Sequence, residues 1–284
     1  MSSWTIRSTL KWAHETLRGE GVNEARLAAE TLLSYALEID RFKLYLQPDL
    51  ALNDTQLNGF RSLIAQRLKG IPIQHLVGHV SFMDVHLQVD ASVLIPRFET
   101  EELVEHALQR CSKVDPFRFL DAGTGSGAIA IALAKALPQV QGVALDCSPE
   151  ALKVAQSNAR LNGVETRLSF VKSDWLSAVE GRFELIVANP PYIPSAQIET
   201  LASEVRDHDP RLALDGGEDG LSAIQTLATQ AKGHLCPQGW LLLEIGQGQA
   251  DAVYRLLNDV GYRNISVYAD LSGIERIVEA QWES

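Results

Sequence analysis

The sequence predicts an α/β protein in which a mostly parallel sheet follows a small N-terminal helical bundle. From residue 117 onward, short apolar runs alternate with stretches of helical periodicity, and this alternation is typical of parallel strands joined by helices. Before residue 75, apolar side chains recur at helical spacing. The 284 residues exceed one average domain and are too few for three. We therefore expect a helical bundle over 1–72, a β-hairpin linker over 73–95 and the sheet domain over 96–284.

The N-terminal part contains helical repeats of apolar residues but no nucleotide-binding loop and no catalytic cluster. The pattern predicts helices over 26–38 and 55–68, with Asn23 capping the first and Asn53 or Asp54 capping the second. Because nothing catalytic is found here, we expect the bundle to help recognise a substrate macromolecule. The alternative is that it only packs against the catalytic domain.

The linker segment changes from helical to alternating spacing. Residues 75–78 and 82–89 alternate apolar and polar side chains, as the strands of a hairpin do. Three histidines, His75, His79 and His86, raise the question of a metal. Their spacing follows the strand alternation, and no cysteine or carboxylate clusters beside them. We expect exposed hairpin histidines and no metal site.

The sheet domain contains apolar runs with the length and composition of strands. In open sheets of parallel strands, ligands bind beyond the carboxyl ends of the strands. The residues that directly follow the first four runs are therefore the candidates for a functional site. The expected strands lie at residues 117–120, 142–145, 168–171, 183–188, 240–245, 265–268 and 276–281.

A glycine-rich loop follows the first of these strands. The segment from Asp121 to Gly127 reads Asp-Ala-Gly-Thr-Gly-Ser-Gly and leads into an apolar helix. Glycines allow a tight turn and a close approach by a ligand, and the helix N-terminus offers free N–H groups and a partial positive charge. Many nucleotide-binding proteins share loops of this kind. The cofactor-binding residues expected here are Gly123, Thr124, Gly125, Ser126 and Gly127.

The second and third strands end in polar residues that complete a nucleotide site. Asp146 ends the second strand, at about the distance downstream at which a carboxylate binds ribose hydroxyls. Asp174 and Trp175 follow the third strand, where a polar group and an indole could flank an adenine ring. An alternative for Asp146 is that it caps the helix that starts near Ser148, and the two roles are compatible. The alternative for Trp175 is core packing.

The fourth strand runs directly into Asn189-Pro190-Pro191-Tyr192. Asn189 offers a carbonyl acceptor and an amide donor, and the prolines fix the backbone so that its carbonyls point in set directions. Tyr192 adds a flat apolar face with a polar tip. The four residues form a rigid cup of acceptors that suits a planar NH2 group. We expect Asn189, Pro190 and Tyr192 to be catalytic and, with Pro191, to bind the substrate. The alternative is a proline-rich turn that only ends the strand.

The glycine loop and the tetrapeptide together narrow the cofactor. A dinucleotide dehydrogenase would explain the loop and Asp146 but gives the tetrapeptide no role. An S-adenosylmethionine (SAM) methyltransferase explains both, because the first three strands hold the cofactor and the fourth ends beside its methyl group. We therefore expect SAM as cofactor, with Asn189 also touching it, and S-adenosylhomocysteine as product.

These motifs resemble the class I, amino-directed methyltransferases and, more narrowly, the PrmC/HemK family of release factor glutamine methyltransferases. The resemblance covers nearly the whole chain and includes the segments 94–101, 210–221 and 243–248. It implies a Rossmann-like, mostly parallel seven-stranded sheet. It also implies that the substrate is the glutamine of the Gly-Gly-Gln motif in bacterial class I release factors. One departure is Phe98, where the family usually has a second proline.

Composition bounds the partners and the compartment. The net charge of −11 disfavours phosphate binding and favours a protein substrate over nucleic acid. The three cysteines are scattered, which argues against a disulfide framework and fits a reducing cytoplasm. The sequence contains neither an apolar run that could span a bilayer nor a signal-peptide pattern. We expect a cytoplasmic monomer that binds release factors and contacts neither membrane nor nucleic acid.

A glutamine amide is a poor nucleophile, so the enzyme must orient it more than activate it. In the leading hypothesis, the Asn189 side-chain oxygen and the Pro190 carbonyl accept the two amide hydrogens while Tyr192 packs on the amide plane. The main alternative is a DNA or RNA adenine N6-methyltransferase, which would use the same cup on a flipped base. A third hypothesis, a SAM-binding regulator without catalysis, leaves the intact tetrapeptide without a purpose.

Overall fold

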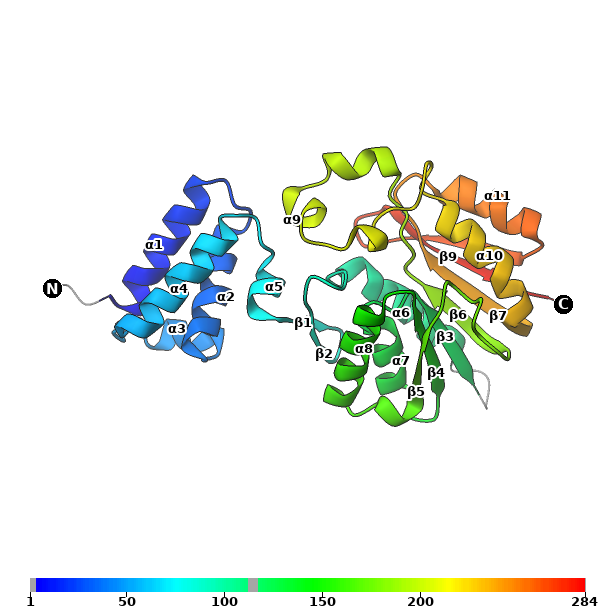
Figure 1. Ribbon diagram of the computed structural model, residues 1–284, viewed down its shortest axis with the longest axis horizontal. Helices are drawn as coiled ribbons and strands as arrows, with labels where there is room; N and C mark the ends of the chain where they lie inside the picture. The colour runs from blue at the N-terminus through cyan, green and yellow to red at the C-terminus, as the bar shows by residue number, and fades with distance from the viewer. Residues whose placement is uncertain (1–3, 112–116, 284) are drawn as a thin grey trace. The chain divides into compact units, whose positions relative to one another are not determined.

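The computed structural model describes residues 4–111 and 117–283. The chain forms two compact units, Met1–Gly78 and His79–Ser284 (Figure 1). Each has a hydrophobic core of its own. The candidate site residues named above all belong to the second unit.

The first unit is helical, as the sequence predicts. Its core includes Ile6, Leu17, Leu33, Phe60 and Ile64, each at most 1% exposed. Its helices are α1 (Ile6–Gly19), α2 (Ala25–Leu37), α3 (Arg41–Leu46), α4 (Asp54–Arg67) and α5 (Ile73–Val77).

The caps of these helices confirm one sequence prediction and correct another. Asn53 caps α4 in a capping box: its side chain accepts from the Gln56 N–H, and the Gln56 side chain accepts from the Asn53 N–H. Asn23 is not the cap of α2. That position is Glu24, which has a left-handed backbone and makes no side-chain capping bond, so the helix begins in a turn that side-chain capping rules do not describe.

The second unit begins with an antiparallel hairpin of strands β1 (His79–Phe82) and β2 (Val85–Gln88). The expected strand over 75–78 is wrong, because residues 73–77 form α5 and Gly78 ends that helix in the left-handed conformation. His79 and His86 lie exposed on the hairpin, whereas His75 lies on α5. Among the described residues, no three His, Cys, Asp or Glu side chains gather as a metal site would require.

The main sheet has seven strands in the order β5-β4-β3-β6-β7-β9-β8. The neighbours from β5 to β7 are parallel, and β9 is antiparallel to both β7 and β8, so the predicted mostly parallel sheet is confirmed. The strands are β3 (Arg118–Ala122), β4 (Gln141–Asp146), β5 (Leu168–Lys172), β6 (Phe183–Ala188), β7 (Leu235–Glu244), β8 (Arg263–Ala269) and β9 (Glu275–Gln281).

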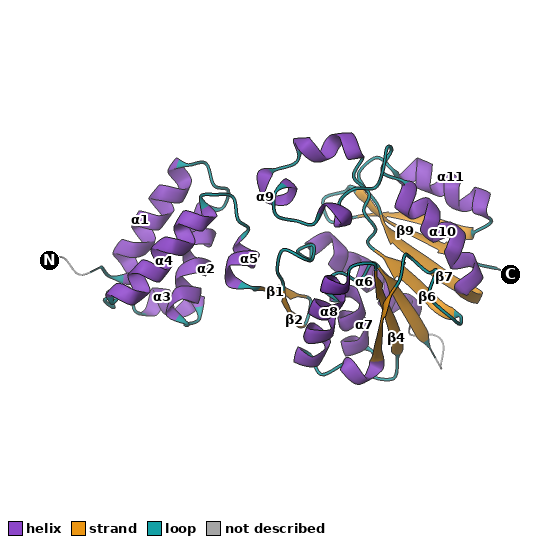
Figure 2. Ribbon diagram, viewed as in Figure 1, coloured by secondary structure: helices purple, strands orange, loops and turns teal. Residues whose placement is uncertain are grey.

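Helices cover both faces of this sheet (Figure 2). The alternating residues of β3 show the division: Phe119 points into the cluster with α6 and α7, and Leu120 points into the cluster with α10 and α11. The long helices are α6 (Phe98–Cys111), α7 (Ala128–Ala136), α8 (Pro149–Leu161), α10 (Ser222–His234) and α11 (Ala250–Val260). Short turns, η1 (Glu165–Arg167), η2 (Ser195–Thr200), α9 (Ser203–Arg206) and η3 (Arg211–Ala213), complete the described elements.

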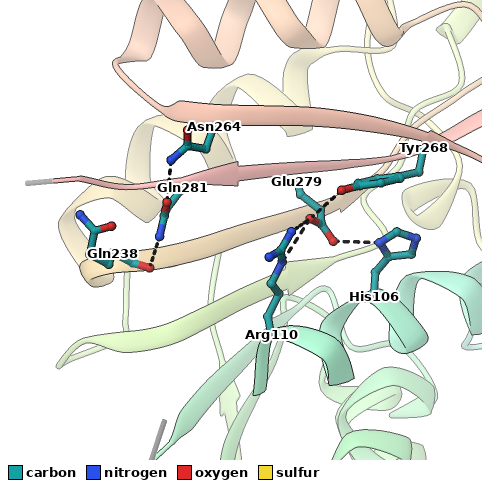
Figure 3. A network of polar contacts seen from close by, with 7 residues as sticks. All are labelled: His106, Arg110, Gln238, Asn264, Tyr268, Glu279 and Gln281. Carbon is teal, nitrogen blue, oxygen red and sulfur yellow. Dashed lines mark hydrogen bonds and ion pairs between the residues drawn. The ribbon is translucent and has the colours of Figure 1, made fainter. Parts of the chain in front are cut away.

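A buried ion-pair network fixes α6 to the antiparallel edge of the sheet (Figure 3). Glu279 on β9 is 1% exposed and pairs with Arg110 and with His106, whose Nδ1 lies 2.8 Å from Glu279 Oε1. The Tyr268 hydroxyl donates to the same carboxylate over 3.4 Å. The Arg110 guanidinium also lies 3.8 Å from the centre of the Trp240 ring. Because Glu279 is paired with a cation, its burial is compensated.

The three cysteines are free thiols in this structure. No helix in the described ranges is both long enough and apolar enough to cross a membrane.

Candidate functional site

The residues that follow β3, β4, β5 and β6 gather at the carboxyl edge of the sheet, because these four strands are parallel neighbours. They line a cavity of about 480 Å³. This volume is in the range of small-molecule sites. The predicted residues that line it are Gly123, Gly125, Asp146, Asp174, Trp175, Asn189 and Pro191.

The glycine loop owes its shape to left-handed backbone at three positions. Gly123, Gly125 and Gly127 have φ of +77°, +54° and +86°, which strain any residue with a Cβ. Gly123 and Gly125 border the cavity. A Cβ on Gly127 would lie 2.8 Å from the Ile131 side chain, so this glycine serves close packing of the helix.

Thr124, Ser126 and Gly127 are not among the residues that line the cavity. Thr124 Oγ1 instead donates to Asp121 Oδ2 over 2.6 Å, and the Ala130 N–H donates to the same oxygen over 3.1 Å. Asp121 is fully buried, and burial raises the pKa of its carboxyl to about 7. This carboxyl joins the start of the loop to the first turn of α7.

Asp146 lies beside the loop and faces the cavity. Its Oδ2 accepts from the Gly125 N–H and its Oδ1 from the Ser148 N–H, both over 2.9 Å. The alternative of Asp146 as a helix cap is wrong, because Ser148 caps α8 by accepting from the Ala151 N–H. These bonds fix the direction of a carboxylate at the cavity wall.

Trp175 lies against the loop at Gly123 and lines the larger cavity. Its backbone has φ of +48°, an uncommon conformation for a bulky residue. A Cβ on Gly123 would lie 3.8 Å from the ring, so the indole is within contact distance of that glycine. Trp175 also packs against the apolar cluster under α10 and α11. The side chain therefore serves both the cavity wall and the core.

A second cavity of about 240 Å³ adjoins the tetrapeptide. Tyr192 lines it, Pro191 lines the larger cavity, and Asn189 lines both. Pro190 is buried and is not among the residues that line either cavity. The smaller cavity is further lined by Arg97, Glu99, Glu244 and Arg276. Asn189 thus stands at the junction of the two cavities.

A hydrogen-bond chain runs from Asn189 into the protein. Asn189 Nδ2 donates to Thr100 Oγ1 over 3.0 Å, and Thr100 Oγ1 donates to Glu244 Oε2 over 2.7 Å. The Tyr192 hydroxyl donates to Glu244 Oε1 over 3.3 Å. Thr100 lies on the first turn of α6 and Glu244 at the end of β7. The two polar side chains of the tetrapeptide, those of Asn189 and Tyr192, are therefore connected to one carboxylate.

Burial is the main cause of the pKa shifts of Glu244 and Tyr192 in this hydrogen-bond network. Glu244 is 1% exposed, and its burial raises the pKa of its carboxyl to about 7. The same desolvation, with the Glu244 charge nearby, raises the pKa of Tyr192 above its ordinary value, so its hydroxyl stays protonated. Tyr192 is a hydrogen-bond donor here and no base.

The backbone around Tyr192 is held by a glycine-rich loop. The Ile193 N–H donates to Leu214 O over 3.0 Å, and Gln249 Nε2 donates to Tyr192 O over 2.9 Å. A Cβ on Gly220 would lie 2.3 Å from Tyr192 O, and one on Gly216 would lie 2.8 Å from Pro191 O. Only glycine allows this close approach.

The segment before α6 is tied to the same region by an ion pair. Arg97 Nη2 lies 2.8 Å from Asp209 Oδ2, and the Asp209 side chain is almost fully buried. Phe98, where a second proline was expected, begins α6 and is 81% exposed.

Sequence reasoning assigned no role to Thr100 and Glu244. Glu244 ends an apolar strand in the segment 243–248, and a carboxylate at the end of a central strand was the available signal. Thr100 lies 89 positions from Asn189 in the chain, and nothing in the local sequence indicates their contact.

Known families and proteins resemble this chain over nearly its whole length. Residues 8–78 match the family described as the PrmC N-terminal domain, and residues 100–218 match the methyltransferase small domain. The chain is 44% identical over 275 residues to a release factor glutamine methyltransferase of Geobacter sulfurreducens, covering 97% of this chain and 96% of the relative. It is 43% identical over 274 residues to one of Moorella thermoacetica, covering 96% of both.

Among solved structures, a methyltransferase from Pyrococcus furiosus superposes with a TM-score of 0.54 at 16% identity, covering 72% of this chain and 92% of that one. At this identity the likeness concerns the fold, which is that of class I methyltransferases.

Proposed function

The chain belongs to the family of release factor glutamine methyltransferases, and we propose that it methylates the side-chain nitrogen of a glutamine in a peptide chain release factor with SAM as donor. The observation that carries this proposal is the place of Asn189, which lines both cavities at the carboxyl edge of the sheet. One cavity would hold the cofactor and the other the acceptor side chain.

The residues of the larger cavity fit SAM. The wall at Gly123 and Gly125 has no side chains, so the ligand can approach the backbone. Asp146 presents a fixed carboxylate that suits ribose hydroxyls, and Trp175 and Asp174 would flank the adenine. When bound, SAM supplies an electrophilic methyl group on a sulfonium sulfur.

The acceptor side relies on orientation. Asn189 donates its N–H to Thr100, so its carbonyl oxygen remains to accept an N–H of the substrate amide. The Pro190 carbonyl would accept the second N–H, which turns the nitrogen lone pair toward the methyl group and stabilises the positive charge that develops on nitrogen. Tyr192 would pack on the amide plane and exclude water. The surplus proton leaves to water after transfer.

The proposed substrate within the release factor is the glutamine of its Gly-Gly-Gln motif. Its two glycines lack side chains, so the glutamine can enter a cavity of about 240 Å³ without obstruction beside it. The net charge of −11 argues against a nucleic-acid substrate, since phosphate contacts require a basic surface.

Mass spectrometry after incubation with SAM tests the proposal. We expect a release factor to gain one methyl group on the glutamine side chain, and its Gln→Ala variant to gain none. Duplex DNA and structured RNA, run in parallel, should stay unmodified. Methylation of adenine at a comparable rate, or methylation of the Gln→Ala variant, would overturn the assignment in favour of the adenine enzyme or of another acceptor.

A further inference from the structure

Glu244 is a buried carboxylate for which the described residues form no ion pair, although Arg276 lines the same cavity. Its side chain is 1% exposed, and within the described part of the chain its hydrogen-bond partners are two hydroxyl groups, those of Thr100 and Tyr192. Glu279, on the neighbouring strand and equally buried, is paired with Arg110 and His106. A buried carboxylate that is held by hydroxyl groups and not by a direct ion pair is only partly compensated, and its burial costs stability. Its presence beside the tetrapeptide therefore requires a reason other than stability.

The directions of the hydrogen bonds from Asn189 through Thr100 to Glu244 indicate what the carboxylate does. An ionised carboxylate only accepts hydrogen bonds, so the 2.7 Å contact with Glu244 Oε2 must use the single proton of the Thr100 hydroxyl. The Thr100 oxygen is then an acceptor toward its other neighbour, Asn189. The group 3.0 Å away must accordingly be the Asn189 NH2 and not its carbonyl. The Asn189 carbonyl oxygen is left to face the cavities.

We propose that Glu244 and Thr100 are positioning residues for methyl transfer, which act by fixing the Asn189 amide with its oxygen toward the acceptor nitrogen. The inference rests on the proposed function. Glu244 also accepts from the Tyr192 hydroxyl over 3.3 Å, so one carboxylate sets the orientation of both functional side chains of the tetrapeptide. Neither Glu244 nor Thr100 needs to touch the cofactor for this role.

The protonation state of Glu244 determines whether the Asn189 amide keeps this orientation. Burial raises the pKa of its carboxyl to about 7; Glu99 on α6 raises it further, and Arg276 on β9 opposes the rise, as do the hydrogen bonds from Thr100 and Tyr192. A protonated Glu244 can donate to Thr100, which frees the Thr100 proton for the Asn189 oxygen and permits the reversed amide. Turnover should therefore fall as the pH drops through the titration of Glu244.

Paired variants of the full chain test this inference. Thr100→Val removes the hydroxyl at nearly constant shape, and Thr100→Ser restores it. We expect Thr100→Val to lower kcat about 10- to 100-fold at saturating SAM and release factor, since a small misplacement of reacting groups can cost about 100-fold in rate. Thr100→Ser should recover most of that loss, and the SAM dissociation constant from calorimetry should change little in both.

Two measurements separate positioning from a structural effect. First, Thr100→Val should cause no further loss of turnover in an Asn189→Ala background, because the orientation of residue 189 then no longer matters. Second, Glu244→Gln should remove the acidic limb of the pH–kcat profile. Glu279→Gln is the matched control, because it removes an equally buried carboxylate. It should lower the melting temperature, but the acidic limb of its pH–kcat profile should remain.

The outcomes are distinguishable from failure of the proposed function. A wild-type enzyme that methylates no glutamine would overturn both proposals. A wild-type enzyme that is active, with Thr100→Val within twofold of it or an acidic limb that persists in Glu244→Gln, would overturn the positioning role alone. If Thr100→Val does not fold, the pH profile of Glu244→Gln still decides.

Discussion

Asn158 on α8 pairs with the backbone of Gln88 on β2 as a neighbouring strand would. Its Oδ1 accepts from the Gln88 N–H over 2.7 Å, and its Nδ2 donates to Gln88 O over 2.9 Å. The same Nδ2 donates to Ser126 O over 2.9 Å. Asn158 is fully buried, so one amide connects the hairpin, α8 and the glycine loop. It also occupies the hydrogen-bonding edge of β2, which would otherwise be open.

Replacing Asn158 should destabilise the second unit strongly. Asn158→Ala leaves the Gln88 N–H and two carbonyls without partners, and we expect a loss of about 2–4 kcal/mol in the free energy of unfolding. Chemical denaturation measures it. Asn162→Ala is the matched control: Asn162 makes the same pair of bonds to the His86 backbone but is partly exposed. Its cost should stay under about 1 kcal/mol, and equal costs for the two variants would contradict the argument.

The sequence was sufficient for the features that depend on local patterns. Alternating strands and helices predicted the parallel sheet, and the rule that ligands bind at carboxyl ends of strands brought Gly123, Asp146 and Asn189 to one edge. The strand Phe183–Ala188 matches its prediction at both ends. Patterns failed near Gly78, where a short helix precedes the hairpin and alternation of apolar residues suits either structure.

Contacts between segments that are distant in the chain could not be predicted from the sequence. The hydrogen bonds Asn189–Thr100 and Thr100–Glu244 join residues 89 and 144 positions apart, and no local propensity reports them. Likewise, the sequence alone gives Asn158 only as a polar residue of an amphipathic helix, and its bonds to Gln88 are evident only from the structure. Tertiary hydrogen bonds, not the motifs, complete the site.

Asp146→Ala should weaken binding of SAM. In the proposed mode of binding, the carboxylate accepts a charge-assisted hydrogen bond from the ribose, which the variant would lack. The variant would also leave the Gly125 N–H without its partner, Asp146 Oδ2. We expect a loss of about 1.5–3 kcal/mol in binding free energy, measured by calorimetry with SAM. Glu150→Ala, which removes a charge from the first turn of α8, is the control and should bind normally. Unchanged affinity in a folded Asp146→Ala protein would sink the assigned role.

Asn189→Ala should reduce turnover while leaving the affinity for SAM nearly intact. In the proposed mechanism the side-chain oxygen of Asn189 orients the acceptor amide, and loss of one such positioned group typically lowers the rate about 100-fold or more. The measurement is methyl transfer at saturating SAM, with calorimetry to confirm cofactor binding. Turnover within a few-fold of wild type would contradict the mechanism.

Asp121→Asn tests the electrostatics of the glycine loop through stability. Burial raises the pKa of Asp121 from 3.8 to about 7, so the folded protein binds this proton more tightly than the unfolded chain. Its contribution is fully present below pH 3.8 and is lost as the pH rises toward 7. Relative to wild type, Asp121→Asn should therefore gain stability with rising pH, by at most about 1.4 kcal/mol per pH unit. Melting curves of both proteins between pH 4 and 8 should diverge; parallel curves would show that Asp121 keeps an ordinary pKa.

The helical unit provides the last prediction, which concerns docking of the release factor. Phe42 and Leu46 lie one turn apart on α3, and their exposed fractions are 68% and 64%. Apolar side chains exposed together often mark protein-binding surfaces. If the unit recognises the substrate, the double variant Phe42→Ser/Leu46→Ser should raise KM for the whole factor about 10-fold. The affinity for SAM and the turnover of a short Gly-Gly-Gln peptide should stay unchanged, since binding energy far from the tetrapeptide benefits only the whole factor. Leu161→Ser, which removes a 57% exposed leucine at the far end of α8, is the control. An unchanged KM for the factor, or an equal rise in the control, would show that the exposed face of α3 does not dock the factor.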